Sequence, residues 1–304
     1  MSQHIRHILD LSAQERQAFV QSFDHILTDC DGVLWTVYEP IPNVGDALTT
    51  LLANGKTIRY ITNNSVRPFE SYATQLGSIG IKLEPTDLIH PAVSIVQYLN
   101  SIHFEGPIYC LATESFKSTL RAAGFGLIDG PTDPVEESFK KILATVNDKA
   151  PVKAVIVDVD FNLNYPKLLR AELYLKGNPE CLLIAGATDK LLHVKHDFKV
   201  MGPGYFSEML EQATGRRTVI LGKPGAELAS QISELYGTTD ARRVLFVGDM
   251  LQQDIAFASR CGFQKLLVMS GGATREEMVN QPADGECVPD YVADSLADLR
   301  QLFD

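Results

Sequence analysis

The sequence predicts an α/β protein in which a doubly wound parallel sheet carries a second, inserted α/β lobe. Three observations lead to this fold class. Short apolar runs alternate with amphipathic stretches, which is the order of strands and helices in a parallel sheet. Polar clusters stand directly after several of the apolar runs. The length of 304 residues exceeds what one hydrophobic core usually organises, which favours two lobes.

The first part of the chain predicts one strand, helix, strand unit. Residues 11–22 have the pattern of a short amphipathic helix, and 25–28 (HILT) form an apolar strand that ends in DCDG. A helix over 44–54 follows, with Asn43 as its cap. A strand over 57–62 then ends in NNS. Two strands joined in this way pair in parallel through a right-handed crossover.

Residues 218–268 repeat the pattern. Strands are expected at TVIL, VLFV and KLLVM, with helices at AELASQISELYG and DIAFASRCG, and these strands would extend the same sheet. The clusters DCDG, TNNS, GKP and GD each follow a strand. Because an open parallel sheet binds its ligand at the carboxyl ends of the strands, the four clusters are expected to converge on one crevice.

The middle of the chain, from 90 to 205, has its own alternation and is assigned to the inserted lobe. The GPG at 202–204 is its expected return hinge, so the core would comprise residues 1–89 and 206–304. The expected elements of the lobe are strands at 107–112, 154–159 and 181–185 and helices around 115–123 and 166–176.

The composition limits the classes of partner. A net charge of -11 argues against nucleic acid, which is bound through a surplus of Lys and Arg. No apolar run is long enough to span a bilayer, and the first residues lack the pattern of a signal peptide. The five cysteines are scattered without Cys-x-x-Cys spacing, as in reduced thiols. We therefore expect a cytoplasmic protein that binds neither nucleic acid nor membrane.

The motif DCDG places two carboxylates at the end of the first strand. Asp29 and Asp31 are too close to ionise together easily, so one is protonated or a cation holds the pair. Such a pair suits a nucleophilic carboxylate beside a group that exchanges a proton with the leaving group. Gly32 permits the tight turn and is counted with the phosphate-binding residues. A surface turn without chemistry is the alternative, which the position after an apolar strand disfavours.

The turn after the second strand supplies candidate phosphate ligands. Thr62, Asn63 and Asn64 offer hydroxyl, amide and backbone N–H groups where the dipole of a following helix favours an anion. Capping chemistry explains the same residues equally well. Lys223 in GKP offers a cation that would offset repulsion between a phosphate and an attacking carboxylate. GKP is not a nucleotide P-loop, because Pro224 replaces the Ser or Thr.

The motif GDMLQQDI adds two further carboxylates. Asp249 follows a buried strand, and with the Asp29 pair it would form an oxygen-rich site suited to Mg²⁺. Asp254 begins a helix, so it could cap that helix and bind the metal as well. Cysteine catalysis is disfavoured, because no cysteine here has an Arg six residues later to hold a phosphate.

Taken in order, these motifs resemble the haloacid dehalogenase superfamily. Within it, the chain resembles the branch of phosphoglycolate, pyridoxal and 4-nitrophenyl phosphatases that carry a C2-type cap. The resemblance runs over nearly the whole chain. The motifs that carry it are DCDGVLW (29–35), ITNNS (61–65), NLNYPKLLRAELYL (162–175), CLLIAGATD (181–189), GKP (222–224), GDMLQQDI (248–255) and DYVADSLADL (290–299).

The resemblance implies a Rossmann-like core with an inserted cap and a role for each motif. Asp29 would be the nucleophile and Asp31 the general acid and base. Thr62 and Asn63 would hold the phosphoryl group, and Lys223 would neutralise it. The Mg²⁺ ligands would be the carboxylates of Asp29, Asp249 and Asp254 with the carbonyl of Asp31. The activity implied is Mg²⁺-dependent hydrolysis of small phosphate monoesters, such as phosphoglycolate, glycerol 3-phosphate, pyridoxal phosphate or 4-nitrophenyl phosphate, through an aspartyl-phosphate.

Substrate choice is expected to come from the cap. The resemblance places a substrate-facing loop after CLLIAGATD, where Asp189, Lys190 and His193 stand, and Arg67 is a further candidate. The chain departs from the pattern of the family at four positions that include neither the nucleophile nor the metal carboxylates. These positions are Phe69, Leu191, Met250 and Gln253.

Two other functions use the same core. A phosphomutase would return isomerised phosphate ester in place of inorganic phosphate. A catalytically silent binding protein would keep the fold and lose the acidic set, whereas Asp29, Asp31, Lys223 and Asp249 are all present. We expect a small phosphorylated metabolite as the ligand and a homodimer formed through the cap.

Overall fold

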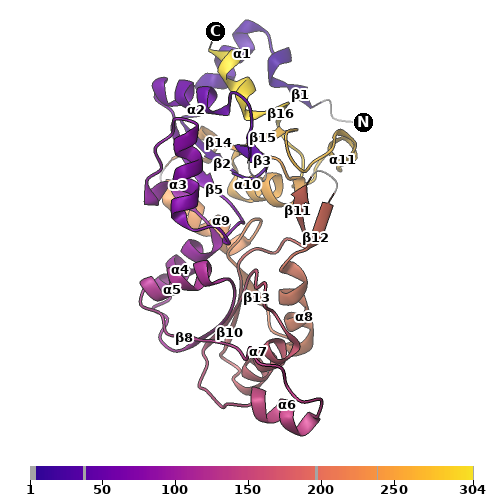
Figure 1. Ribbon diagram of the computed structural model, residues 1–304. Coiled ribbons are helices and arrows are strands. Elements are labelled where there is room, and N and C mark those ends of the chain that lie inside the picture. The colour runs from indigo at the N-terminus through magenta and orange to yellow at the C-terminus, as the bar shows by residue number, and fades with distance from the viewer. Residues whose placement is uncertain (1–4, 37–38, 196–197, 238, 304) are drawn as a thin grey trace. The chain divides into compact units, whose positions relative to one another are not determined.

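The computed structural model describes residues 5–36, 39–195, 198–237 and 239–303, and the side chains of 193–195 lie outside that description. The chain forms two compact units (Figure 1). The first unit comprises Met1–Thr62, Phe69–Ile89 and Leu228–Asp304, and the second comprises Asn63–Pro68 and His90–Glu227.

The first unit is built on a parallel sheet of seven strands in the order β1-β16-β15-β14-β2-β5-β6. The neighbouring strands β14 and β2 in the middle of this sheet are short and almost wholly buried, which explains their continuous apolar runs. The strands are β1 (Arg6–His7), β2 (His25–Thr28), β5 (Thr57–Ile61), β6 (Leu88–Ile89), β14 (Val244–Gly248), β15 (Gln264–Val268) and β16 (Tyr291–Ala293).

Helices cover both faces of this sheet. The larger core packs α1, α2, α3 and η5 on one face, and a smaller core packs α9 and α10 on the other. Alternate residues of β2 serve the two faces, because Ile26 belongs to the larger core and Leu27 to the smaller. The helices are α1 (Ala13–Ser22), α2 (Val44–Ala53), α3 (Phe69–Ser78), α9 (Ala226–Tyr236), α10 (Ala256–Cys261), α11 (Arg275–Val279), the 3₁₀ helices η1 (Ile8–Asp10), η2 (Pro85–Asp87), η3 (Ala241–Arg243) and η5 (Leu296–Leu302), and the π-helix η4 (Leu251–Ile255).

The second unit has its own parallel sheet of five strands in the order β13-β10-β9-β7-β8. Helices α4 and α5 pack on one face, and α7 and α8 pack on the other. An antiparallel hairpin of β11 and β12 belongs to the same unit, whereas the small β3-β4 hairpin belongs to the first. The elements are β7 (Ile108–Leu111), β8 (Leu127–Ile128), β9 (Ala154–Val157), β10 (Leu182–Ala185), β11 (Leu191–Lys195), β12 (Phe198–Met201), β13 (Thr218–Ile220), α4 (Pro91–Ser101), α5 (Glu114–Ala122), α6 (Phe139–Val146), α7 (Tyr165–Gly177) and α8 (Gly204–Thr214), with β3 (Trp35–Thr36) and β4 (Glu39–Pro40) in the first unit.

One strand lies in a different sheet from the one expected. The strand at TVIL is β13, and it pairs in parallel with β10 of the second unit, so it does not extend the sheet that contains β2. The second unit therefore continues to Glu227 rather than ending at 205. The GPG at 202–204 is not a return hinge, because Gly204 begins α8 inside the second unit. Local sequence pattern identifies a strand but not the sheet that it joins.

Two helices of the first unit begin near the residues that the sequence predicted. The amphipathic stretch at 11–22 forms α1, which Ser12 and Glu15 start with a reciprocal capping box. Asn43 precedes α2 as expected, but its φ is 63° and its side chain makes no capping hydrogen bond.

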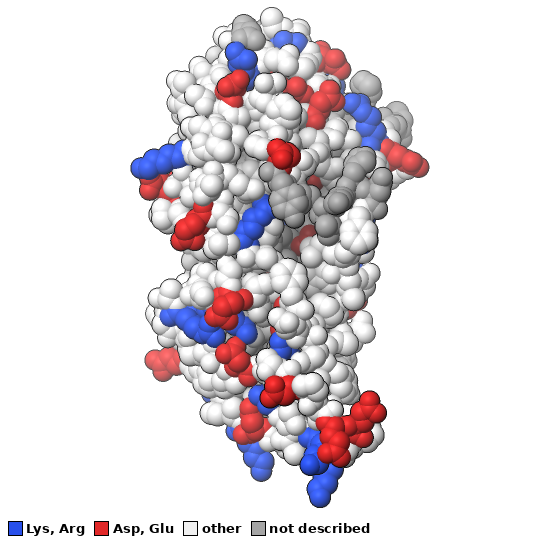
Figure 2. Space-filling model, viewed as in Figure 1, with Lys and Arg blue, Asp and Glu red and all other residues white. Residues whose placement is uncertain are grey.

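Within the described residues, no helix is long and apolar enough to cross a membrane. Figure 2 shows acidic and basic side chains interspersed over the visible face.

Candidate active site

Three predicted site residues immediately follow neighbouring strands of the first sheet. Asp29 comes after β2, Thr62 after β5 and Asp249 after β14, and β2 pairs with both of the other strands. The strands are parallel, so their carboxyl ends meet at one edge. The predicted convergence is correct for these three residues. Lys223 follows β13 and belongs to the second unit, so it does not come from this edge.

Three buried carboxylates meet at this edge. Oxygen atoms of Asp29, Asp249 and Asp254 lie within 4.8 Å of one another. The three residues are 8%, 5% and 0% exposed, so solvent screens their mutual repulsion poorly. A set of oxygen donors at this spacing fits a hard divalent cation such as Mg²⁺, which would relieve that repulsion. These residues therefore fit the metal that the sequence predicted.

The backbone holds the Asp29 side chain in one orientation. The Asp29 N–H donates to the Val247 carbonyl at 2.9 Å, which continues the pairing of β2 with β14. The Cys30 N–H donates to Asp29 Oδ1 at 2.7 Å. A carboxylate held in this way keeps its rotamer without paying further conformational entropy when a substrate arrives.

The Asp31 side chain has a different environment from that of Asp29. Its Oδ1 accepts a hydrogen bond from Trp35 Nε1 at 2.9 Å, and its carboxylate is not one of the three that converge. Trp35 is 1% exposed, so the indole that orients Asp31 is itself fixed in the core. The two aspartates of DCDG thus have different hydrogen-bond partners. Different environments suit different roles, with one carboxylate as the nucleophile and the other as the general acid and base.

Gly32 is required by the turn and by the carboxylate beside it. Its φ is +83°, and a Cβ built on it would lie 2.3 Å from Asp249 Oδ2. Its N–H donates to the Trp35 carbonyl at 2.7 Å, and its carbonyl accepts from Ser270 Oγ at 2.7 Å. Both backbone groups of Gly32 have partners within the fold, and its place in phosphate binding stays a prediction. Its role is to let the chain pass close to Asp249.

Asp254 holds the backbone just before its helix and joins the carboxylate group. Its Oδ2 accepts from the N–H groups of Asp249 at 3.0 Å and Met250 at 2.9 Å. It lies in η4, a π-helical turn of the kind often found at functional sites. Asp254 does not begin the helix as expected, because the helix begins at Leu251 with Met250 as its N-cap and has no side-chain capping bond. The departure from the family pattern at Met250 leaves the hydrogen bond to Asp254 intact, because only the Met250 backbone takes part.

A further loop supports Asp249 and was not identified in the sequence. The Gly272 N–H donates to Asp249 Oδ2 at 2.6 Å, and the Ala273 N–H donates to the Asp249 carbonyl at 2.9 Å. The available signal was SGG at 270–272, a glycine pair directly after the strand KLLVM. Small polar residues after a parallel strand lie at the same edge as the other clusters.

Thr62 lies at this edge, and Asn63 belongs to the second unit. Thr62 is 2% exposed, and its N–H donates to the Ile89 carbonyl at 3.0 Å. The Asn63 side chain connects parts of the second unit: its Nδ2 donates to Asp189 Oδ2 at 2.8 Å and to the Lys223 carbonyl at 3.0 Å. Its Oδ1 accepts from the Lys223 N–H at 2.8 Å. The Asn63 amide therefore holds two other predicted site residues, and its contact with phosphate stays a prediction.

The remaining predicted residues have mixed environments. Asn64 Oδ1 accepts from the Val66 N–H at 3.2 Å, which is turn chemistry. Arg67 is partly buried in the same 63–68 segment. Lys190 pairs with Glu208 at 2.8 Å, and the side chain of His193 lies outside the described residues. Phe69 packs against the larger core, Leu191 is 50% exposed on β11, and Gln253 lies in η4.

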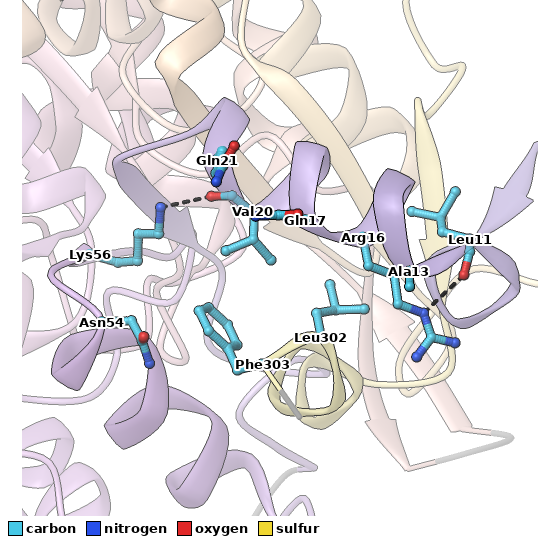
Figure 3. Close-up of a pocket in the computed structure, with 10 residues that line it drawn as sticks. All are labelled: Leu11, Ala13, Arg16, Gln17, Val20, Gln21, Asn54, Lys56, Leu302 and Phe303. Carbon is cyan, nitrogen blue, oxygen red and sulfur yellow. Dashed lines mark hydrogen bonds between the residues drawn. The ribbon is translucent and has the colours of Figure 1, made fainter.

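A pocket of about 550 Å³ in the first unit lies away from this chemistry (Figure 3). Asn54 and Lys56 line it and precede β5, so the pocket lies toward the amino ends of the strands. Lys56 Nζ donates to the Val20 carbonyl at 2.7 Å, and Arg16 Nε donates to the Leu11 carbonyl at 2.9 Å. Both cations bind backbone carbonyls, so the pocket lacks the character of a phosphate site.

Comparison with known proteins gives matches over most of the chain. Residues 26–126 match the model of haloacid dehalogenase-like hydrolases, and residues 220–299 match the model of HAD-hydrolase-like proteins. The 4-nitrophenylphosphatase of Schizosaccharomyces pombe is 32% identical over 299 residues, which covers 95% of this chain and 97% of the relative. The glycerol-3-phosphate phosphatase of Homo sapiens is 30% identical over 303 residues, with 95% and 94% covered.

A solved structure has the same fold. It is the glycerol phosphate phosphatase of Mycobacterium tuberculosis in complex with magnesium, with a TM-score of 0.72 and 22% identity. The match covers 93% of this chain and 78% of the other. At this identity the likeness concerns the fold alone.

Proposed function

This chain belongs to the haloacid dehalogenase-like hydrolases and is a phosphatase, and we propose that it cleaves small phosphate monoesters through a phosphoaspartate on Asp29. The observation that carries the proposal is the meeting of Asp29 with Asp249 and Asp254 at the end of the central strands. A buried carboxylate with a fixed rotamer, beside a site for a divalent cation, is suited to attack a phosphorus atom.

The reaction divides into two displacements at phosphorus. In the first, a carboxylate oxygen of Asp29 forms a bond to phosphorus while the bond to the ester oxygen breaks, and Asp31 gives its proton to the leaving oxygen. In the second, Asp31 takes a proton from water, whose oxygen attacks phosphorus and releases phosphate from Asp29. The Trp35 hydrogen bond to Asp31 keeps this acid and base in a fixed orientation during both steps.

The family generally uses Mg²⁺, and the three carboxylates fit that ion. We propose that Asp29, Asp249 and Asp254, with the carbonyl of Asp31, would hold it. When bound, the ion would supply positive charge that neutralises the phosphate and orients it for in-line displacement. Asp254 contributes in a further way, since it holds the Asp249 backbone through a hydrogen bond.

Cations and donors of the chain complete the proposed site. Lys223 would offset the negative charge on the transferring phosphoryl group, and the Thr62 hydroxyl would donate to one of its oxygens. The support for both is the match of their motifs to the family and the burial of the side chains, which are 1% and 2% exposed.

The proposed substrates are small phosphorylated metabolites. The names of the relatives point to glycerol 3-phosphate and 4-nitrophenyl phosphate, and phosphoglycolate and pyridoxal phosphate belong to the same chemical class. The second unit would supply the residues that select among them, including His193 and Arg67, whereas Asp189 would act on all of them through its hydrogen bond from Asn63. Specificity would arise there because the phosphate, which all substrates share, is bound by the motifs already described.

The test is a panel of these four esters with Mg²⁺, read by release of inorganic phosphate. Hydrolysis of at least one ester by the parent protein, lost in Asp29→Asn, supports the proposal. Release of an isomeric phosphate ester in place of phosphate would identify a mutase. An unaltered rate in Asp29→Asn would rule out the covalent mechanism.

We propose, in addition, that the protein is cytoplasmic and that two copies pair through the second unit. The β11–β12 hairpin exposes Leu191, Phe198 and Met201, and α8 exposes Tyr205 and Met209. Apolar side chains gathered on neighbouring elements of one unit are typical of a surface that another protein covers. A dimer by light scattering that becomes a monomer in Met201→Asp supports this pairing, and a monomeric parent protein contradicts it.

A further inference from the structure

The second unit contains a buried carboxylate that the mechanism above does not use. Asp158 is 1% exposed and directly follows β9, at the carboxyl edge of the second sheet. Its Oδ1 accepts from Ser65 Oγ at 2.6 Å and from the Val159 N–H at 2.7 Å. Its Oδ2 accepts from the Ala187 N–H at 2.9 Å. All three partners are donors, so the site is built for an acceptor.

These hydrogen bonds join two segments that are far apart in the sequence. Ser65 lies in the 63–68 turn, two residues after Asn63, and Ala187 lies in the loop after β10, two residues before Asp189. The same two segments are joined a second time, where Asn63 Nδ2 donates to Asp189 Oδ2 at 2.8 Å. With a single contact the two segments could still rotate about that contact. Two contacts fix both their separation and their relative rotation.

The placement of Asn63 also determines that of Lys223. The Asn63 amide bonds both the N–H and the carbonyl of Lys223, so the two residues move as one piece. Asp158 therefore reaches Lys223 through Ser65 and the short turn that contains Asn63. Double hydrogen bonding of a side-chain amide to one residue's backbone is geometrically demanding, and small shifts of the turn would break it.

The backbone is packed directly around the Asp158 carboxylate. A Cβ built on Gly186 would lie 1.9 Å from Asp158 Oδ2, so only glycine allows the loop to approach this closely. An amide in place of the carboxylate would turn an N–H group toward the backbone N–H of either Ala187 or Val159. Burial raises the pKa of Asp158 to about 6, although its three hydrogen bonds favour the charged form. The molecule keeps a costly acceptor where an apolar side chain would suffice for packing alone.

We propose that Asp158 is a positioning residue for phosphate binding: it holds the 63–68 turn against the loop that carries Asp189 and so places Asn63 and Lys223. The inference rests on the proposed phosphatase function. It predicts that loss of either link of Asp158 weakens the binding of phosphate itself, whatever the remainder of the substrate.

The chain offers a matched control. Asp160 stands two residues further along the same segment, and its side chain is 7% exposed. It pairs with Lys167 of α7 at 2.8 Å and is not bonded to Ser65 or Ala187 among the described residues. Asp160→Asn breaks a buried ion pair and so costs stability, but it leaves the Asp158 links in place.

The experiment compares Asp158→Asn, Ser65→Ala, their double variant and Asp160→Asn in the full chain with Mg²⁺. The substrate is 4-nitrophenyl phosphate, and inorganic phosphate is the competitive inhibitor. Asp158→Asn and Ser65→Ala should each lower kcat/KM by about tenfold and raise the phosphate inhibition constant by a similar factor, as supporting residues around a site often do. Both single substitutions break the same connection, so their effects should not add. The kcat/KM of the double variant should be close to that of the single variant with the larger loss.

The results separate this inference from the proposed function. An inactive parent protein, or an active Asp29→Asn, contradicts the phosphatase mechanism. An active parent in which Asp158→Asn and Ser65→Ala lose no more than Asp160→Asn overturns the positioning role, as do losses that multiply in the double variant. An increase in the phosphate inhibition constant that occurs in the Asp158 and Ser65 variants but not in Asp160→Asn supports the positioning role. Ser65→Ala removes only a hydroxyl, so it decides the case if Asp158→Asn does not fold.

Discussion

The backbone N–H of Asp249 donates to the carboxylate of Asp254 at 3.0 Å, so the two acidic residues after β14 hold each other in place. The Asp254 side chain thereby serves the fold and the carboxylate group together. An amide at this position could still accept the hydrogen bond through its oxygen, but it would carry no negative charge.

Asp254→Asn should therefore separate metal binding from folding. We expect the Mg²⁺ concentration for half-maximal activity to rise by about 10-fold to 100-fold, with a thermal midpoint close to that of the parent. The measurement is a Mg²⁺ titration of phosphate release beside a thermal melt. Asp240→Asn is the control, because Asp240 also accepts a backbone hydrogen bond, from Arg242, and is exposed. An equal Mg²⁺ requirement in both variants would contradict the role of Asp254.

Asp29→Asn should abolish turnover and leave the fold intact. An amide of the same shape is neither an adequate nucleophile nor an anionic metal ligand, so we expect a loss on the order of 10³-fold or more. Asp24→Asn is the matched control, since Asp24 precedes the same strand and pairs with Arg243 at its other end. Steady-state phosphate release gives the rates, and circular dichroism monitors the fold. Residual activity near the parent rate would contradict the nucleophile assignment.

Removal of the metal should abolish activity reversibly. Excess chelator should stop phosphate release, and added Mg²⁺ should restore it, because three buried carboxylates otherwise repel one another and the phosphate. Ca²⁺ should bind but support little turnover, because its larger and looser coordination shell misplaces the nucleophile. Mg²⁺ should also raise the thermal midpoint of the parent but not that of Asp249→Asn, by the general linkage of binding to stability. Full activity in chelator would exclude the metal site.

The ionisation of Asp158 should make stability depend on pH. Burial raises the pKa of this carboxyl from 3.8 to about 6, so between these values the folded chain retains a proton that the unfolded chain has lost. The folded state then binds more protons, and its stability falls as pH rises from about 4 to 6. The stability of the parent relative to Asp158→Asn should fall by roughly 2 kcal/mol over this range.

Urea unfolding of the parent and Asp158→Asn at pH 4.5 and 7.5 measures this difference. Burial lowers the pKa of His90 to about 4, so this residue changes stability with pH in the direction opposite to that of Asp158. Both proteins contain His90, so its contribution cancels when they are compared. That histidine favours the folded state above its ordinary pKa and loses this contribution as pH falls toward 4. A difference between the proteins that does not change with pH would show that Asp158 ionises normally.

Residues of the second unit should divide into those that act on all substrates and those that act on some. Asp189→Ala should weaken every ester, because it removes a partner of Asn63 and so disturbs the turn that binds phosphate. His193→Ala should weaken metabolite esters several-fold to about tenfold and 4-nitrophenyl phosphate much less, because that leaving group needs little positioning. The measurement is kcat/KM for both kinds of substrate. Equal losses in His193→Ala would place the specificity residues elsewhere in the second unit.

The sequence by itself determined where the chemistry-bearing residues stand along the chain. An apolar run followed at once by a polar cluster marked the ends of β2, β5 and β14. This signal is local, because a buried strand of a parallel sheet must be apolar and its carboxyl end must leave the core. Asp29 and Asp249 could therefore be predicted as neighbours without a structure.

Only the tertiary structure decided which sheet each strand joins and which donor each side chain meets. The strand before Lys223 looks like the others, yet it pairs with β10 of the second unit. Asp158 carried no motif, and its significance comes from Ser65 and Ala187, which are distant in sequence. The partners of the Asn63 amide, Asp189 and Lys223, likewise come from segments that are distant in sequence. Periodicity reports the burial of a residue, whereas a hydrogen-bond partner is chosen by long-range packing that no local pattern records.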